Sequence, residues 1–164
     1  MRTLLVLRHA KSSWKDADLS DHDRPLNKRG KKNAPAIGKL IKEEGLTPQW
    51  IASSSALRAR KTAEAAAKGF EHAGPIHYMK ELYLAQPSEI LDVLRKTAPD
   101  SATRVLLVGH NPGLEALVGT LTSRREPFPT GALAQIELAI ESWSELSGEV
   151  RGELVHLWRP RDLD

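Results

Sequence analysis

The sequence predicts a three-layer α/β domain, in which a mainly parallel sheet with an antiparallel edge lies between helices. Short apolar runs, typical of buried strands, alternate with longer stretches whose apolar residues recur at helical spacing. Two late strand-like segments flank a polar turn and are expected to pair antiparallel. With 164 residues the chain has the size of one domain, and we expect a single domain over residues 1–164.

The first half of the chain contains two strand–helix pairs. The predicted elements are, in order, a strand at 4–7, a polar loop at 12–29, a helix at 30–45, a strand at 49–53 and a helix that runs to residue 70. The first helix carries apolar residues three and four positions apart and closes at Gly45, a residue that suits a left-handed helix end. Ser53, Ser54 and Ser55 offer N-cap groups to the second helix.

The second half repeats the alternation and then changes to the antiparallel pair. The predicted elements are a strand at 76–79, a helix from residue 87, a strand at 104–109, a helix from residue 112, and strands at about 132–139 and 153–158. Asn111 as N-cap and Pro112 at the first helical position mark the start of the fourth helix.

Composition narrows the functional classes. The net charge of +3 suits acidic or phosphorylated partners. There is no cysteine, which excludes disulfides, thiolate metal sites and a cysteine nucleophile. The histidines lack metal-ligand spacing, and we expect no metal and no other cofactor. No signal peptide or membrane span is recognised, so a cytoplasmic location is expected, with neither nucleic acid nor membrane as a partner.

Two of the predicted strands end in a histidine. Arg8 and His9 follow the first strand, and His110 follows the strand at 104–109. Residues just beyond the carboxyl ends of parallel strands face the crevice where ligands bind. His110 also precedes a helix start, whose free N–H groups favour an anion. We therefore expect both histidines at one edge of the sheet, beside an anion.

Arg58 falls in the first turn of the second predicted helix. A cation there opposes the helix dipole, so a guanidinium aimed at a bound oxyanion explains it better than helix stability does. Each of these residues alone also fits an ordinary structural role. Their convergence at one edge of the sheet is what favours a catalytic site. Two arginines and two histidines at one edge of the sheet predict a phosphate pocket, in which a neutral imidazole would attack phosphorus.

The ordered motifs resemble the histidine phosphatase superfamily, which is also called phosphoglycerate-mutase-like. The motifs are Arg8-His9-Ala10, Ser54 to Arg58 followed by Arg60 to Glu64, and Gly109 to Gly113. The short length and the Arg-His-Ala-Lys-Ser run resemble most closely the SixA-type phosphohistidine phosphatases. The resemblance covers nearly the whole chain and implies a phosphoglycerate-mutase-like fold.

The resemblance also implies roles for individual residues. It makes His9 the nucleophile that becomes phosphorylated. Arg8 and Arg58 match the phosphate-binding arginines, and His110 matches the histidine that stabilises the transferring phosphoryl group. Asn111, which follows that histidine, is a further candidate for phosphate binding.

The general acid is left open. Glu81 follows the third strand at about the place where many relatives carry a proton-donating Glu, and it fits an exposed, ion-paired carboxylate equally well. Asp18, Asp21 and Asp23, on the loop after His9, are alternative donors. Phosphohistidine leaves as an imidazole, which needs less help from an acid than an alkoxide does. A weak or missing acid would therefore favour a substrate with an N–P bond.

Three functions remain as hypotheses. The first is a metal-independent phosphatase that hydrolyses phosphohistidine on a protein through phospho-His9, because short segments between motifs leave little room for a capping subdomain. The second is a phosphomonoesterase or mutase that acts on small phosphorylated metabolites. The third is a non-catalytic phosphate-binding module, against which the two histidines argue, since arginines and backbone amides suffice for binding alone. The sequence carries no signal for an oligomeric state.

Overall fold

The computed structural model describes residues 1–163 and contains one six-stranded sheet. The strands are β1 (Arg2–Arg8), β2 (Trp50–Ser54), β3 (His77–Met79), β4 (Arg104–Gly109), β5 (Leu133–Leu138) and β6 (Gly152–Trp158), in the spatial order β3-β2-β4-β1-β5-β6. Strands β1 to β4 pair in parallel, whereas β5 runs antiparallel to β1 and β6 antiparallel to β5. The mainly parallel sheet with an antiparallel edge is confirmed.

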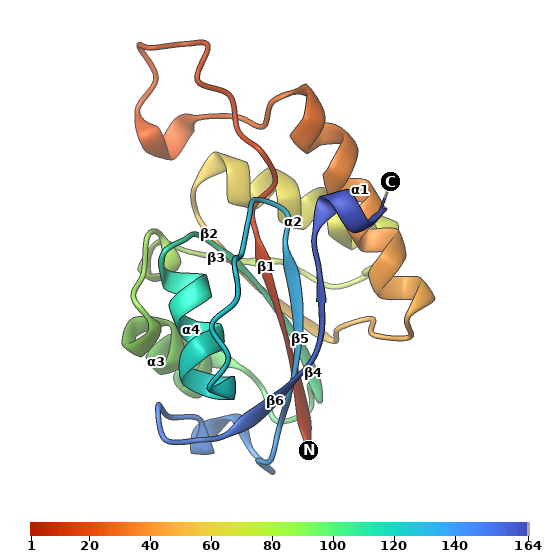
Figure 1. Ribbon diagram of the computed structural model, residues 1–164, viewed down its shortest axis with the longest axis vertical. Helices are drawn as coiled ribbons and strands as arrows, with labels where there is room; N and C mark the ends of the chain where they lie inside the picture. The colour runs from red at the N-terminus through yellow and green to blue at the C-terminus, as the bar shows by residue number, and fades with distance from the viewer. Residues whose placement is uncertain (164) are drawn as a thin grey trace.

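Helices cover both faces of the sheet (Figure 1). The α-helices are α1 (Lys28–Glu43), α2 (Leu57–Gly69), α3 (Pro87–Thr97) and α4 (Gly113–Thr122). Helices α1 and α2 share one apolar core with the sheet, and α3 and α4 share the other. The predicted three layers are therefore present. Within residues 1–163, no helix is long and apolar enough to cross a membrane.

The central strand β1 shows why this sheet needs two helical layers. Its Leu4 and Val6 pack into the core beneath α3 and α4, and its Leu5 and Leu7 pack into the core beneath α1 and α2. All four side chains are fully buried. Successive strand residues point to opposite faces, so a continuous apolar run is what a strand covered on both sides requires.

The structure corrects the predicted starts of α1 and α2. Helix α1 begins at Lys28 rather than at Gly30, because Asn27 Oδ1 accepts a hydrogen bond from the Gly30 N–H at 2.8 Å and caps the helix there. The N-cap position of α2 is Ala56, and its side chain makes no capping bond. The serines before it do not cap α2, and Ser54 ends β2 instead.

Helix α4 also starts later than the sequence indicates. It begins at Gly113, and Pro112 occupies the N-cap position. The Asn111 side chain still serves the first turn, because its Oδ1 accepts a hydrogen bond from the Glu115 N–H at 3.1 Å. The predicted N-cap residue therefore acts as a cap from one position further out.

Candidate active site

Two histidines lie side by side at the carboxyl end of the sheet. The register pairs Arg8 of β1 with Gly109 of β4, and the His9 N–H donates to the Gly109 carbonyl at 3.0 Å. The ring centroids of His9 and His110 are 5.1 Å apart, and both residues are buried. Parallel pairing of β1 and β4 thus brings two residues about a hundred positions apart to one point.

His9 has the protonation pattern of a nucleophile. Its Nδ1 lies 2.8 Å from the Ala10 carbonyl oxygen. A carbonyl only accepts hydrogen bonds, so Nδ1 carries the ring proton and Nε2 keeps its lone pair. Burial lowers the pKa of His9 to about 4; the Arg58 guanidinium adds to this effect, and the bond to Ala10 opposes it. The imidazole is therefore neutral at physiological pH.

His110 keeps one polar atom free for a ligand. Its Nε2 lies 2.7 Å from Ser54 Oγ, at the end of β2. Its Nδ1 is buried and has no hydrogen-bond partner among the described residues. Burial, with His9 and Arg58 nearby, lowers the pKa of His110 to about 3. When the Ser54 hydroxyl donates to Nε2, Nδ1 carries a proton that it can give to an oxygen of a bound anion.

Two arginines line the same cleft as the histidines. Arg8 Nη1 donates to the Phe128 carbonyl at 3.1 Å, and Arg8 Nε is buried without a partner in the described part of the chain. Arg58 is buried in the first turn of α2, where its Nη1 donates to the Asp21 carbonyl at 2.6 Å. Guanidinium groups that line a cavity have the charge and the donors that suit an oxyanion.

Asp21 accepts hydrogen bonds from three side chains, two of which line the cleft. Its Oδ1 accepts from Arg24 Nη1 at 2.7 Å, and its Oδ2 accepts from Arg58 Nη2 at 3.0 Å and from the Tyr83 hydroxyl. The bond from Tyr83, followed by those from the two arginines, holds the pKa of Asp21 well below its usual range. The carboxylate is therefore ionised and acts as an acceptor rather than as a proton donor.

The sequence indicated Asp21 only as an alternative acid and Ser54 only as a capping and motif residue, and it singled out neither Arg24 nor Tyr83. A signal for Arg24 was present, since it is an arginine within an acidic loop just after the first strand. Tyr83 had no comparable signal, since it reaches Asp21 from the segment between β3 and α3. Nothing in the sequence indicated that Ser54, one of three consecutive serines, would meet His110.

A cleft of about 450 Å³ connects these groups. Its lining residues are Arg8, His9, Lys11, Ser12, Trp14, Asp21, Arg24, Arg58, Leu84, His110, Asn111 and Thr130. Asp21 is the one carboxylate among these described residues. Trp14 is exposed at the rim, and the Arg24 guanidinium carbon lies 3.3 Å from its ring centroid. Across residues 1–163, no group of three or more histidine or carboxylate side chains is placed to hold a metal ion.

The remaining candidates from the sequence are placed differently. Glu81 is exposed in the 3₁₀ turn Lys80–Leu82 and does not line the cleft. Asp18 and Asp23 are also exposed outside it. Asn111 lines the cleft, but both ends of its amide are already used: Nδ2 donates to the Phe128 carbonyl at 2.9 Å, and Oδ1 caps α4.

Comparisons with known sequences identify the family. The model of the histidine phosphatase superfamily (branch 1) matches residues 4–83. An uncharacterized chloroplastic protein of Arabidopsis thaliana is 34% identical over 154 residues, which cover 88% of this chain and 70% of that protein. An uncharacterized protein of Mycobacterium tuberculosis is 33% identical over 147 residues, which cover 81% of this chain and 87% of that protein.

Solved structures show the same fold. A protein from Agrobacterium tumefaciens, assigned as a phosphohistidine phosphatase SixA, is 29% identical with a TM-score of 0.82, covering 97% of this chain and 98% of its own. A protein from Nakamurella multipartitia with the same assignment is 28% identical with a TM-score of 0.83, covering 97% and 96%. A protein histidine phosphatase SixA complexed with tungstate, 22% identical, shares the fold with a TM-score of 0.84 and 99% coverage of both chains.

The structure is that of a three-layer α/β protein with two histidines side by side at the carboxyl ends of two parallel strands. The chain belongs to the histidine phosphatase superfamily, branch 1. Within that superfamily it groups with the SixA-type proteins. This membership supports a phosphatase.

Proposed function

We propose that this protein is a metal-independent phosphatase that hydrolyses phosphohistidine on a protein through a phosphohistidine intermediate at His9. One observation carries the choice of substrate. The cleft contains a neutral nucleophile, but its one described carboxylate, Asp21, is held ionised by Tyr83, Arg58 and Arg24. An alkoxide leaving group would need a proton donor at this point, whereas a leaving imidazole needs far less help.

The first chemical step transfers the phosphoryl group to His9. The Nε2 lone pair attacks phosphorus while the N–P bond of the substrate breaks, and the leaving imidazole takes the bonding electron pair and a proton from water. Arg8 and Arg58 neutralise charge on the phosphoryl oxygens, and the Nδ1–H of His110 donates to one of them. The low pKa of His9 keeps Nε2 unprotonated and ready to attack.

The second step returns the enzyme to its starting state. A water oxygen attacks phosphorus while the bond from phosphorus to His9 Nε2 breaks, and Nε2 keeps the bonding electron pair. The attacking water releases a proton to solvent, which replaces the proton taken in the first step, and inorganic phosphate leaves. The same arginines and His110 serve this step, because the transferring group is the same. The charge that a metal would otherwise bring is supplied by the guanidinium groups.

Two further observations support a phosphohistidine-bearing protein as substrate. The cleft opens at a rim formed by exposed Trp14 and Leu84, so a side chain on a protein surface can enter it. The relatives at 28–29% identity are assigned as phosphohistidine phosphatases.

The test measures kcat/KM of the purified protein for a phosphohistidine peptide and for a panel of alkyl and aryl phosphate esters. We expect the phosphohistidine peptide to be preferred, and His9→Ala to lose at least about 10³-fold on every substrate. Rapid quenching during turnover should trap an acid-labile, base-stable phosphate on His9. His156→Ala, an exposed histidine on β6, is the matched control and should keep full activity.

Two results would contradict the proposal. Retained activity in the His9→Ala variant would show that His9 is not the nucleophile. A preference for phosphate esters over every phosphohistidine substrate would instead favour the small-molecule phosphomonoesterase.

A further inference from the structure

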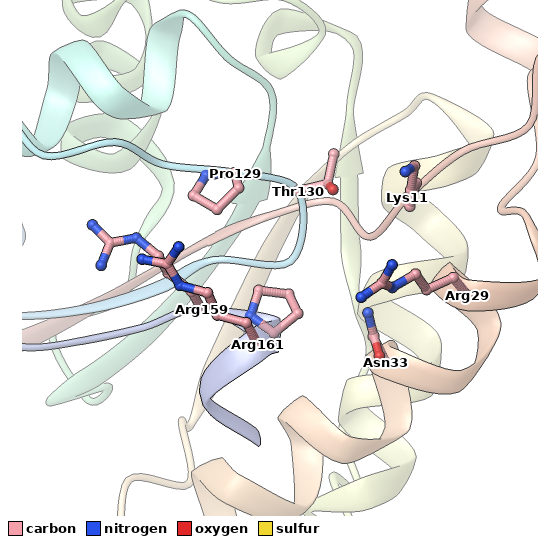
Figure 2. A pocket seen from close by; sticks show the side chains of 8 residues that line it. Lys11, Arg29, Asn33, Pro129, Thr130, Arg159 and Arg161 are labelled. Carbon is pink, nitrogen blue, oxygen red and sulfur yellow. The ribbon is translucent and has the colours of Figure 1, made fainter. Parts of the chain in front are cut away.

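A second hollow adjoins the catalytic cleft. Its volume is about 230 Å³, and it shares Lys11 and Thr130 with the cleft. The cations that line it come from segments far apart in the sequence: Lys11 after β1, Arg29 in α1, and Arg159 and Arg161 after β6. Figure 2 shows Lys11 and Arg29 on one side of the hollow and the two C-terminal arginines on the other.

Residues 1–163 neutralise little of the positive charge of this hollow. No carboxylate of the described residues lines it. Within residues 1–163, the side chains of Lys11 and Arg29 make no hydrogen bond and no ion pair. Arg159 donates to the Pro127 carbonyl at 3.1 and 3.0 Å, and Arg161 Nε lies 3.9 Å from Asp162 Oδ1, its one ion pair among residues 1–163. Like charges gathered in this way repel one another, and a bound anion relieves that repulsion.

The cationic surface continues beyond the hollow. Arg159 and Arg161 also line a third hollow, whose volume is about 510 Å³. This hollow shares Arg8 with the catalytic cleft. The carboxylate there, Glu115, already accepts a hydrogen bond from the Phe128 N–H at 3.2 Å. The three hollows therefore surround the loop at residues 127–130 with basic side chains. This extent exceeds one phosphate and suits several carboxylates on a protein surface.

We propose that the hollow lined by Lys11, Arg29, Arg159 and Arg161 binds acidic side chains of the phosphoprotein substrate while its phosphohistidine occupies the cleft. This inference rests on the proposed function. It adds which substrates the enzyme selects, namely phosphoproteins with acidic residues near the phosphohistidine. Aspartate or glutamate residues near the phosphohistidine supply the carboxylates. Arg29 and Arg161 line this hollow and not the catalytic cleft, so they contribute to choice of substrate rather than to phosphoryl transfer.

The experiment compares two phosphohistidine peptides that differ only in flanking residues, Glu in one and Gln in the other. The measured quantity is the ratio of their kcat/KM values. The Arg29→Gln/Arg161→Gln double variant should lower that ratio by about 3- to 10-fold, the size expected for two partly exposed charge pairs. Raising the ionic strength to about 0.5 M should shrink the ratio for the wild type as well.

The matched control removes the same two charges elsewhere. Lys39→Gln/Arg151→Gln changes two exposed residues that line none of these hollows, and it should leave the ratio unchanged. An unchanged ratio in the Arg29→Gln/Arg161→Gln variant would overturn the inference. So would equal losses in the two double variants, because the effect would then be one of net charge. A selective loss on small bisphosphate esters, with both peptides unaffected, would assign the hollow to a second phosphate and likewise overturn the carboxylate assignment.

A binding measurement separates this inference from the proposed function. An unphosphorylated, fluorescein-labelled Glu-rich peptide is titrated with each protein, and its anisotropy gives a Kd that does not depend on turnover. Weaker binding by the Arg29→Gln/Arg161→Gln variant alone supports the binding of acidic side chains in the hollow, even if phosphohistidine is not hydrolysed. Equal binding by all three proteins overturns it even if phosphohistidine is hydrolysed.

Discussion

Asp21 is the one carboxylate among the described residues that line the cleft, and its surroundings favour the charged form. The Tyr83 hydroxyl and two guanidinium groups all donate to it, and each bond is lost or weakened when the carboxylate is protonated. Its contribution is therefore positional. It holds Arg58 and Arg24 in place from the loop that follows His9.

The first prediction at the residue scale concerns the role of Asp21. Asp21→Asn should lower kcat/KM by about 10-fold or more on phosphohistidine and on an alkyl phosphate alike, because a charge-assisted bond that orients Arg58 is lost. Arg58→Ala should impair both substrates more strongly, because the guanidinium itself serves the phosphoryl group.

Glu81→Gln is the control for this prediction. Since Glu81 lies outside the cleft, the change should leave both rates within about twofold. A loss on the alkyl phosphate alone, in the Asp21→Asn or the Glu81→Gln variant, would identify a general acid and would weaken the argument for an N–P substrate.

At the scale of elements, α1 and α2 pack against each other at very close range on one face of the sheet. A Cβ at Gly38 of α1 would overlap the Ala66 carbonyl of α2, and a Cβ at Gly69 would meet the backbone of Gly38. The two helices therefore approach at glycines, where backbones can touch. The close approach fixes the C-terminal half of α2 against α1.

Gly38→Ala should consequently destabilise the protein. We expect the free energy of unfolding to fall by about 1–3 kcal/mol, because the new methyl group forces the helices apart. Gly119→Ala in α4 is the matched control: an added Cβ there meets only ordinary contacts, so helix propensity should leave stability equal or raise it by up to about 1 kcal/mol. Urea titration of both variants checks the pair. Equal stability of Gly38→Ala and wild type would contradict the close crossing.

For the whole molecule, the buried histidines make stability depend on pH. In the unfolded chain a histidine has a pKa near 6.5, whereas the folded values are about 4 for His9 and about 3 for His110. Between pH 6.5 and these values the unfolded state binds more protons, so the free energy of unfolding falls as the pH falls. The depressed pKa of Asp21 adds to the loss in the same direction at still lower pH.

We therefore expect stability to decline from pH 7 to pH 4, by at most about 3 kcal/mol for His9 alone. Urea titrations across this range measure it. A His9→Gln/His110→Gln variant should show a shallower decline, and His156→Gln, on the exposed edge strand, should match the wild type. Identical slopes in all three proteins would show that the two site histidines titrate normally.

Some features of this protein followed from the sequence alone, because they depend on neighbours along the chain. The apolar run of β1 indicated a strand buried on both faces, and its end at Arg8 and His9 indicated a ligand crevice. The second strand ending in His110 and the cation at Arg58, in the first turn of α2, indicated two further residues that line the same cleft. Helix starts were less accurate, because capping is decided by which side chain reaches a free N–H, as Asn27 does for α1.

Other features were decided only by tertiary structure, since they join residues that the sequence keeps apart. Tyr83 reaches Asp21 across 62 positions, and Ser54 reaches His110 across 56. No local pattern distinguishes that tyrosine or that serine from its neighbours, and the bonds exist because parallel strands bring their carboxyl ends together. The basic hollow beside the cleft has the same origin, because Lys11, Arg29 and Arg161 become neighbours only when the chain after β6 returns to α1.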